Sequence, residues 1–193
     1  MKERPILFSA PMIRALLAGT KTQTRRVVKP VQLRADGMWP AGRDPVPDCP
    51  YGQPGDRLWV RECFSGARAY EARGYPLREW GNKVFYWADG QPRSGDWTKP
   101  RPSIHMPRTL SRITLQITEV RVERLQDISE ADALAEGIVP RTKGELTMFF
   151  AGAEACGRTA IGAYNQLWNH LNGPGSWDAN PWVWVVGFKR VQP

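Results

Sequence analysis

Lys21 and Thr24, three residues apart, are the first pair in this chain whose types and spacing suggest chemistry. Gly19 is typical of a helix end and permits a sharp reversal of the chain. Lys21 is therefore expected at the turn that follows, where it can swing toward Thr24. A lysine beside a threonine hydroxyl can act as base and nucleophile when burial or a neighbouring cation lowers the pKa of the amine. The pair predicts a candidate catalytic site.

The residues around this pair are expected on a strand over 21–28, whose side chains alternate between two faces. Thr22, Thr24 and Arg26 then share one face, and Lys21 and Arg25 share the other. The two arginines would lower the pKa of the lysine or bind a phosphate. Spacing alone favours a basic strand over a catalytic pair, because Lys-x-x-Thr is a common pattern.

The charge of the chain favours a partner that carries phosphate. The 193 residues include 27 basic and 19 acidic side chains, for a net charge of +8. Such an excess promotes association with nucleic acid by counterion release. Nine tryptophans and five tyrosines add surfaces on which bases can stack. A nucleoside or RNA is the expected partner, and a charge that serves only solubility is the alternative.

Cysteine and histidine are too sparse for a disulfide framework or a dedicated metal site. The three cysteines, Cys49, Cys63 and Cys156, have no C-x-x-C spacing, and there are two histidines. An odd number of scattered cysteines indicates a reducing compartment, so we expect a cytoplasmic protein without a zinc site. No apolar run follows the basic N-terminus, so neither a signal peptide nor a membrane span is expected.

The hydrophobic pattern predicts a mixed α+β fold, in which non-local strands outnumber helices. Ser129 and Asp132 form a capping-box pattern that opens a short helix ending at Gly137. A change of phase near Thr118 indicates a bulge between two strand segments. The other expected elements are strands over 5–9, 55–62, 84–87, 113–122 and 182–186, helices over 10–18 and 161–171, and a loop over 139–158. One domain over 1–193 is expected, with Gly/Pro-rich loop inserts at about 29–55 and 65–110.

The order of these motifs resembles the ASCH domain family. Gly-x-Lys-Thr-x-Thr-x-Arg follows the first helix, then come Gly-Asp-x-Leu-x-Val, paired strands, and a short helix containing Ala-x-x-x-Ala-Glu. The matching pieces are residues 13–26, 55–62, 112–138 and 182–190. The layout is similar to the longer ASCH proteins of bacteriophages and prophages. The resemblance implies a PUA-like β-barrel of five or six strands with flanking helices, linked to RNA.

One branch of that family comprises small bacterial amidohydrolases that remove the acetyl group of acetylcytidine. Their catalytic lysine and threonine fall on Lys21 and Thr24 here, at the mouth of a cleft for a nucleoside or RNA, and their glutamate falls on Glu136. The resemblance implies that Lys21 takes a proton from Thr24 or a water, and that Glu136 protonates the departing amine or orients the lysine. It implies no cofactor and no metal. The inserts and Arg25, which stands where those enzymes carry an apolar residue, are departures.

Two other readings of the family remain open: a metal-assisted ribonuclease, and a non-catalytic RNA-binding module of phage origin. Further candidates for binding are Ser9, at a helix N-terminus, Thr22, on the same strand face as Thr24, and Trp177, expected to be exposed for stacking. Arg61 and Glu62 are candidates for a partly buried ion pair in the wall of the cleft. For Ser9 helix capping is the alternative, and for Arg61 and Glu62 it is an ordinary strand end.

Overall fold

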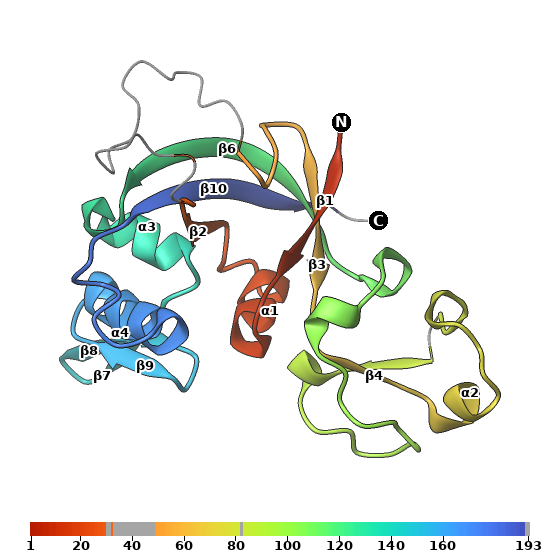
Figure 1. Cartoon of the computed structure of the whole chain (residues 1–193). Coiled ribbons are helices and arrows are strands. Elements are labelled where there is room, and N and C mark those ends of the chain that lie inside the picture. The colour runs from red at the N-terminus through yellow and green to blue at the C-terminus, as the bar shows by residue number, and fades with distance from the viewer. Residues whose placement is uncertain (30–31, 33–48, 82, 192–193) are drawn as a thin grey trace.

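The computed structural model describes residues 1–29, 32, 49–81 and 83–191. Most of the insert expected at 29–55 lies outside these residues. Figure 1 shows a long curved sheet, with helices gathered beneath it and a smaller lobe beside it.

The main sheet has five strands in the order β1-β3-β6-β10-β2. Only the pair β1–β3 is parallel, and the other pairs are antiparallel. The bounds are β1 Glu3–Leu7, β2 Gln23–Val27, β3 Arg57–Arg61, β6 Thr114–Arg124 and β10 Trp182–Val191. The predicted α+β class is confirmed, and five strands agree with the expected five or six.

The long strand β10 organises the packing, because each of its faces is buried in a different core. Trp184 and Val186 pack with residues of β1, β3 and α1, whereas Val183 and Val185 pack with α3 and α4. All four side chains are fully buried. The near-continuous apolar run at 182–186 predicted such a central strand.

The phase change predicted near Thr118 is a bulge. Gly187 pairs with Glu119, but the next residue, Phe188, pairs with Ile117. Thr118 is therefore the extra residue on β6, and the two predicted segments form one continuous strand. A bulge increases the local bend of a strand, which helps β6 to curve over the helices.

Three helices are drawn below the long strands β6 and β10 in Figure 1. They are α1 Ala10–Leu17, α3 Glu130–Ala135 and α4 Ala160–Asn172. Ser129 caps α3 as predicted, since its hydroxyl accepts a hydrogen bond from the backbone N–H of Asp132 at 3.1 Å. Thr159 caps α4 in the same way through Gly162, at 3.0 Å.

The segment 139–158, expected to be a loop, instead forms a three-stranded antiparallel sheet. Its strands are β7 Val139–Lys143, β8 Leu146–Ala151 and β9 Ala155–Gly157, in the order β7-β8-β9. The expectation was wrong because β7 is exposed along its whole length, so its sequence lacks the apolar alternation that marks a half-buried strand.

Residues 64–110 form the lobe beside the main sheet. It holds a two-stranded sheet, β4 Phe64–Gly66 with β5 Val84–Tyr86, and a short helix α2 Arg68–Ala72. Its own small core is built from Phe64, Trp80, Val84, Met106 and Leu110. Short 3₁₀ turns complete the chain at Leu77–Glu79, Trp87–Asp89, Ser103–His105, Arg108–Leu110 and Leu125–Asp127.

Within the described residues, no helix is both long enough and apolar enough to cross a membrane.

We expect Ser129→Ala to lower the free energy of unfolding by about 1 kcal/mol, because the first turn of α3 loses its side-chain acceptor. Urea denaturation would measure the change. Ser94→Ala is the control, since Ser94 is exposed and lies outside every helix. Equal stability of Ser129→Ala and the control would contradict the capping role.

Candidate functional site

The turn after α1 lies directly against the end of α3, and this contact joins Lys21 to Glu136. Lys21 Nζ donates to Glu136 Oε2 at 2.7 Å and to the backbone oxygen of Glu136 at 2.9 Å. The backbone N–H of Thr22 also donates to Ala135 O at 2.8 Å. Gly137 makes the approach possible: it has φ of +97°, and a Cβ there would lie 3.0 Å from Ala15 Cβ and 3.3 Å from Lys21 Cβ.

Both partners of this ion pair are buried, with side chains 0% and 2% exposed. Burial lowers the pKa of Lys21, and the carboxylate of Glu136 opposes that change. The nearby charges of Arg26 and Arg25 lower the pKa further. The ring of Phe8 lies 5.6 Å from Lys21 Nζ. Lys21 is thus a desolvated amine held in one place by one carboxylate.

Arg25 approaches the same carboxylate from the strand β2. Its Nη1 lies 3.3 Å from Glu136 Oε1, and its Nη2 lies 2.5 Å from Glu123 Oε1 and 3.2 Å from Asp132 Oδ2. The guanidinium is fully buried, so these carboxylates offset the cost of its desolvation. Arg25, a candidate for phosphate binding, is engaged in this ion-pair network.

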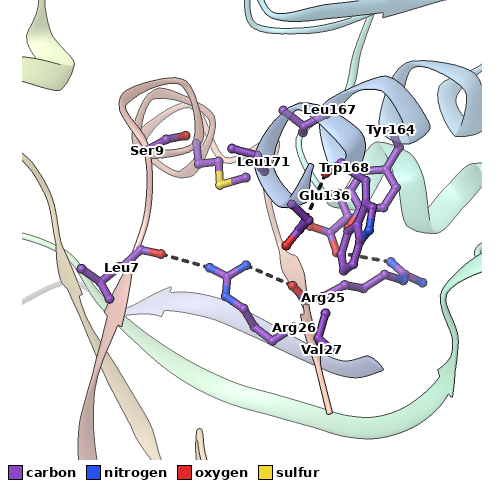
Figure 2. A pocket seen from close by; sticks show the side chains of 12 residues that line it. Leu7, Ser9, Arg25, Arg26, Val27, Glu136, Tyr164, Leu167, Trp168 and Leu171 are labelled. Carbon is purple, nitrogen blue, oxygen red and sulfur yellow. Dashed lines mark hydrogen bonds and ion pairs between the residues drawn. The ribbon is translucent and has the colours of Figure 1, made fainter. Parts of the chain in front are cut away.

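Tyr164 on α4 is a further neighbour of Glu136. Burial raises the pKa of the phenol well above its ordinary value, and the charge of Glu136 and its hydrogen bond with the phenol act in the same direction. The Glu136 carboxylate therefore meets Lys21, Arg25 and Tyr164, which come from three different parts of the fold. Figure 2 shows Glu136 together with Arg25 and Tyr164.

Thr24 is also fully buried, but its hydroxyl faces Arg26 and not Lys21. Arg26 Nη1 donates to Thr24 Oγ1 at 2.8 Å, and Nη2 donates to the backbone oxygen of Leu7 at 3.0 Å. Arg26 thereby connects β2 and β1, the two edge strands of the main sheet. Lys21 was expected to swing toward Thr24. It binds Glu136 instead, because the carboxylate offers a stronger, charge-assisted hydrogen bond.

A cavity of about 290 Å³ opens beside these groups, between β1, β2 and α4. Figure 2 shows it from close by. Its polar lining includes Glu136, Arg25 and Arg26, and most of the remaining wall is apolar. The lining residues are Leu7, Ser9, Met12, Arg25, Arg26, Val27, Glu136, Tyr164, Leu167, Trp168, Leu171 and Asn172. Lys21 and Thr24 do not line the cavity; they lie behind its wall, whereas they were expected at its mouth.

Of two other predicted binding residues, Ser9 and Thr22, only Ser9 lines this cavity. Ser9 is the residue before α1 and lines the cavity, but its side chain makes no capping hydrogen bond, contrary to the capping alternative. Thr22 is exposed and does not line the cavity. Its backbone oxygen accepts from Phe188 at 2.8 Å, so it connects β2 to β10.

Arg61 and Glu62 do not form the predicted ion pair. Glu62 is 2% exposed and accepts from Arg112 through both carboxylate oxygens, at 2.8 and 2.9 Å. Arg61 stacks over the ring of Trp59, 4.6 Å from its centroid. Consecutive residues at a strand end point to opposite faces, which separates the two side chains. Neither residue lines the cavity.

Trp177 is not the exposed stacking residue that was expected. It is 8% exposed and packs in the core beneath the sheet, 6.3 Å from the ring of Tyr164 between centroids. The glycine-rich loop before it predicted exposure, but the Asn169 side chain accepts from the Trp177 backbone N–H at 3.0 Å and holds the residue inward.

The sequence did not identify Tyr164 and Trp168 as cavity residues. Both lie on the apolar face of α4, which indicated burial without indicating what the face covers.

Among the described residues, no group of three or more histidine, cysteine or acidic side chains is placed to hold a metal ion.

Comparison with known proteins adds little. No protein-family model matches the chain, and no curated protein matches its sequence. Among solved structures, it is similar to the ASCH domain from Lactobacillus crispatus JV V101, a high-resolution crystal structure. The identity is 12%, the TM-score is 0.36, and the match covers 98% of this chain and 79% of that one. A similarity this distant transfers neither site residues nor activity to this chain.

We expect Glu136→Gln to cost about 3–5 kcal/mol of folding free energy, because Lys21 and Arg25 would lose their shared buried counter-charge. Lys21→Met should cost less, since Glu136 keeps Arg25 and the methionine fills the lysine's volume beside Phe8. Urea denaturation of both variants measures the order. A larger loss in Lys21→Met would show that Glu136 is not the group on which the network depends.

We also expect an acid-sensitive contribution from Asp132. Burial alone would raise its pKa, but the hydrogen bond from Gln23 and the charges of Arg121 and Arg25 hold the pKa at about 2, against an ordinary value of 3.8. Because the folded pKa is the lower one, this stabilisation is present above pH 4 and is lost as the pH falls toward 2. Asp132→Asn should flatten the pH dependence of unfolding in that range, and an unchanged slope would contradict the assignment.

Proposed function

We propose that this protein is a hydrolase that cleaves an acyl amide on a modified nucleoside, of the acetylcytidine type. The observation that carries the proposal is the direct contact of Lys21 with Glu136 at 2.7 Å, beside a cavity that Glu136 lines. The sequence resemblance to the ASCH amidohydrolases names the same two residues and Thr24. A mostly apolar cavity with a few fixed polar groups suits a flat, neutral base.

The proposal gives Lys21, Thr24 and Glu136 distinct roles. Burial lowers the pKa of Lys21, so the amine can give up its proton and, once neutral, accept the proton of the nucleophile, which is Thr24 Oγ1 or a water. The nucleophile adds to the acetamide carbonyl, and collapse of the adduct expels the cytosine amine, which takes up the proton that Lys21 accepted. With water as the nucleophile, the products are acetate and the free nucleoside. With Thr24 as the nucleophile, the acetyl group first remains on Oγ1 as an ester, and a water then hydrolyses this ester to acetate and the free threonine. Of the two roles considered for Glu136, orienting Lys21 is favoured, because its carboxylate already receives hydrogen bonds from Lys21 and Arg25.

Arg26 is suited to stabilise the reaction's oxyanion. Its guanidinium lines the cavity and donates to Thr24 Oγ1 at 2.8 Å. A carbonyl under attack gains negative charge on oxygen, and a fixed cation beside it lowers the barrier. Attack by Thr24 itself requires Arg26 to release that hydroxyl, whereas attack by a water does not.

The test is incubation of the purified protein with acetylcytidine and, separately, with structured RNA, each with and without manganese. We expect acetate release that needs no metal and falls at least 100-fold in Lys21→Met. Lys143→Met is the matched control, because Lys143 is exposed on β7. Equal activity of wild type and Lys21→Met would eliminate the site.

Other outcomes identify the other readings of the family. Cleavage of RNA only with manganese would favour the ribonuclease. Stoichiometric RNA binding without turnover, weakening steeply with salt, would favour a binding module.

Quenched reactions analysed by mass spectrometry separate the two nucleophiles: an acetylated Thr24 peptide identifies the threonine, and its absence in an active enzyme identifies water.

A further inference from the structure

The lobe of residues 64–110 carries three aromatic side chains on one face of its small sheet. Phe85 and Trp87 contact edge to face, with ring centroids 5.7 Å apart, and Phe85 and Trp97 lie 5.6 Å apart. All three are half-buried, so part of each ring meets solvent. We call Phe85, Trp87 and Trp97 the aromatic face.

Strand register puts these rings on the side away from the lobe's core. Phe64 pairs with Tyr86 and Gly66 with Val84, and that side holds the core. Ser65 pairs with Phe85 on the opposite side. Residues 65 and 67 share that side by alternation, and Ala67 is bridged to Trp97. The aromatic face therefore contributes nothing to the lobe's own core cluster.

Both indoles are held in place by their N–H groups. Trp87 Nε1 donates to Ser65 Oγ at 2.8 Å, and Trp97 Nε1 donates to the backbone oxygen of Ser94 at 2.8 Å. Since these donors are already satisfied, the surface that the rings offer a partner is their π-face and edge. Rings ordered in advance also lose little entropy when a partner binds.

The lobe that carries the aromatic face has an excess of positive charge. Residues 64–110 include eight basic and four acidic side chains. Among the described residues, Lys83, Arg93 and Lys99 are exposed and make no ion pair with any carboxylate. Lys83 immediately precedes β5, and alternation places it on the same side as Phe85 and Trp87.

We propose that the aromatic face binds single-stranded nucleic acid, with bases stacked on Trp97 and Trp87 and phosphates near Lys83, Arg93 and Lys99. Flat rings next to free cations match a chain that alternates bases with phosphates. A protein partner would also use the aromatic rings, but it gives no reason for the excess of positive charge. This surface is separate from the cavity, and the proposal does not depend on hydrolase activity.

The test is fluorescence anisotropy of the full chain with labelled oligouridylate, oligodeoxythymidylate and a duplex of equal length. We expect binding of the single strands and weak binding of the duplex. Trp97→Ala should weaken single-strand binding about 5- to 100-fold, the usual effect of removing one stacking ring. Trp97→Phe should restore most of it. Lys83→Ala should reduce the slope of log K against log salt by about one.

Tyr75→Ala is the matched control, because Tyr75 is an exposed aromatic of the same lobe whose backbone oxygen binds Trp80 on the core side. Equal affinity of wild type, Trp97→Ala and Trp97→Phe would overturn the proposal, and so would a duplex that binds as tightly as a single strand. Leu171→Glu, which puts a negative charge in the wall of the cavity, should bind oligonucleotides like the wild type; a loss there would assign the binding to the cavity.

Discussion

The buried carboxylate of Glu136 is the interaction on which this structure depends. Two cations, on Lys21 and Arg25, lie out of contact with water, and such charges are stable inside a protein only with a counter-charge in contact. Glu136 is that counter-charge for both. Because its three side-chain neighbours come from the turn after α1, from β2 and from α4, one carboxylate holds together the elements that enclose the cavity.

The same network links the cavity to the surface. Arg25 joins Glu136 to Glu123 and Asp132, and Arg121 on β6 pairs with those two carboxylates in turn. Charges therefore become progressively more exposed from the cavity wall to the edge of α3. A change of one buried member shifts the electrostatic field at the others, so a change at Asp132 reaches Glu136 through Arg25.

Much of the fold was predictable from local signals. The strand β10, the bulge at Thr118 and the Ser129 cap were all expected from patterns that span only a few residues. The sheet over 139–157 was not, because β7 is exposed and carries no apolar alternation. The lobe was recognised only as a Gly/Pro-rich insert with one strand, since β4 is three residues long and its aromatic face becomes visible only through strand register.

The sequence by itself indicated a lysine, a threonine and a distant glutamate as a candidate set, because their types and order resemble a known catalytic set. Only the tertiary structure decided how they meet. Lys21 binds Glu136, and Thr24 faces Arg26. Lys21 and Thr24 both lie behind the cavity wall. The reason is physical. Which buried cation finds which carboxylate depends on contacts between residues more than a hundred positions apart, and no local pattern specifies such a contact.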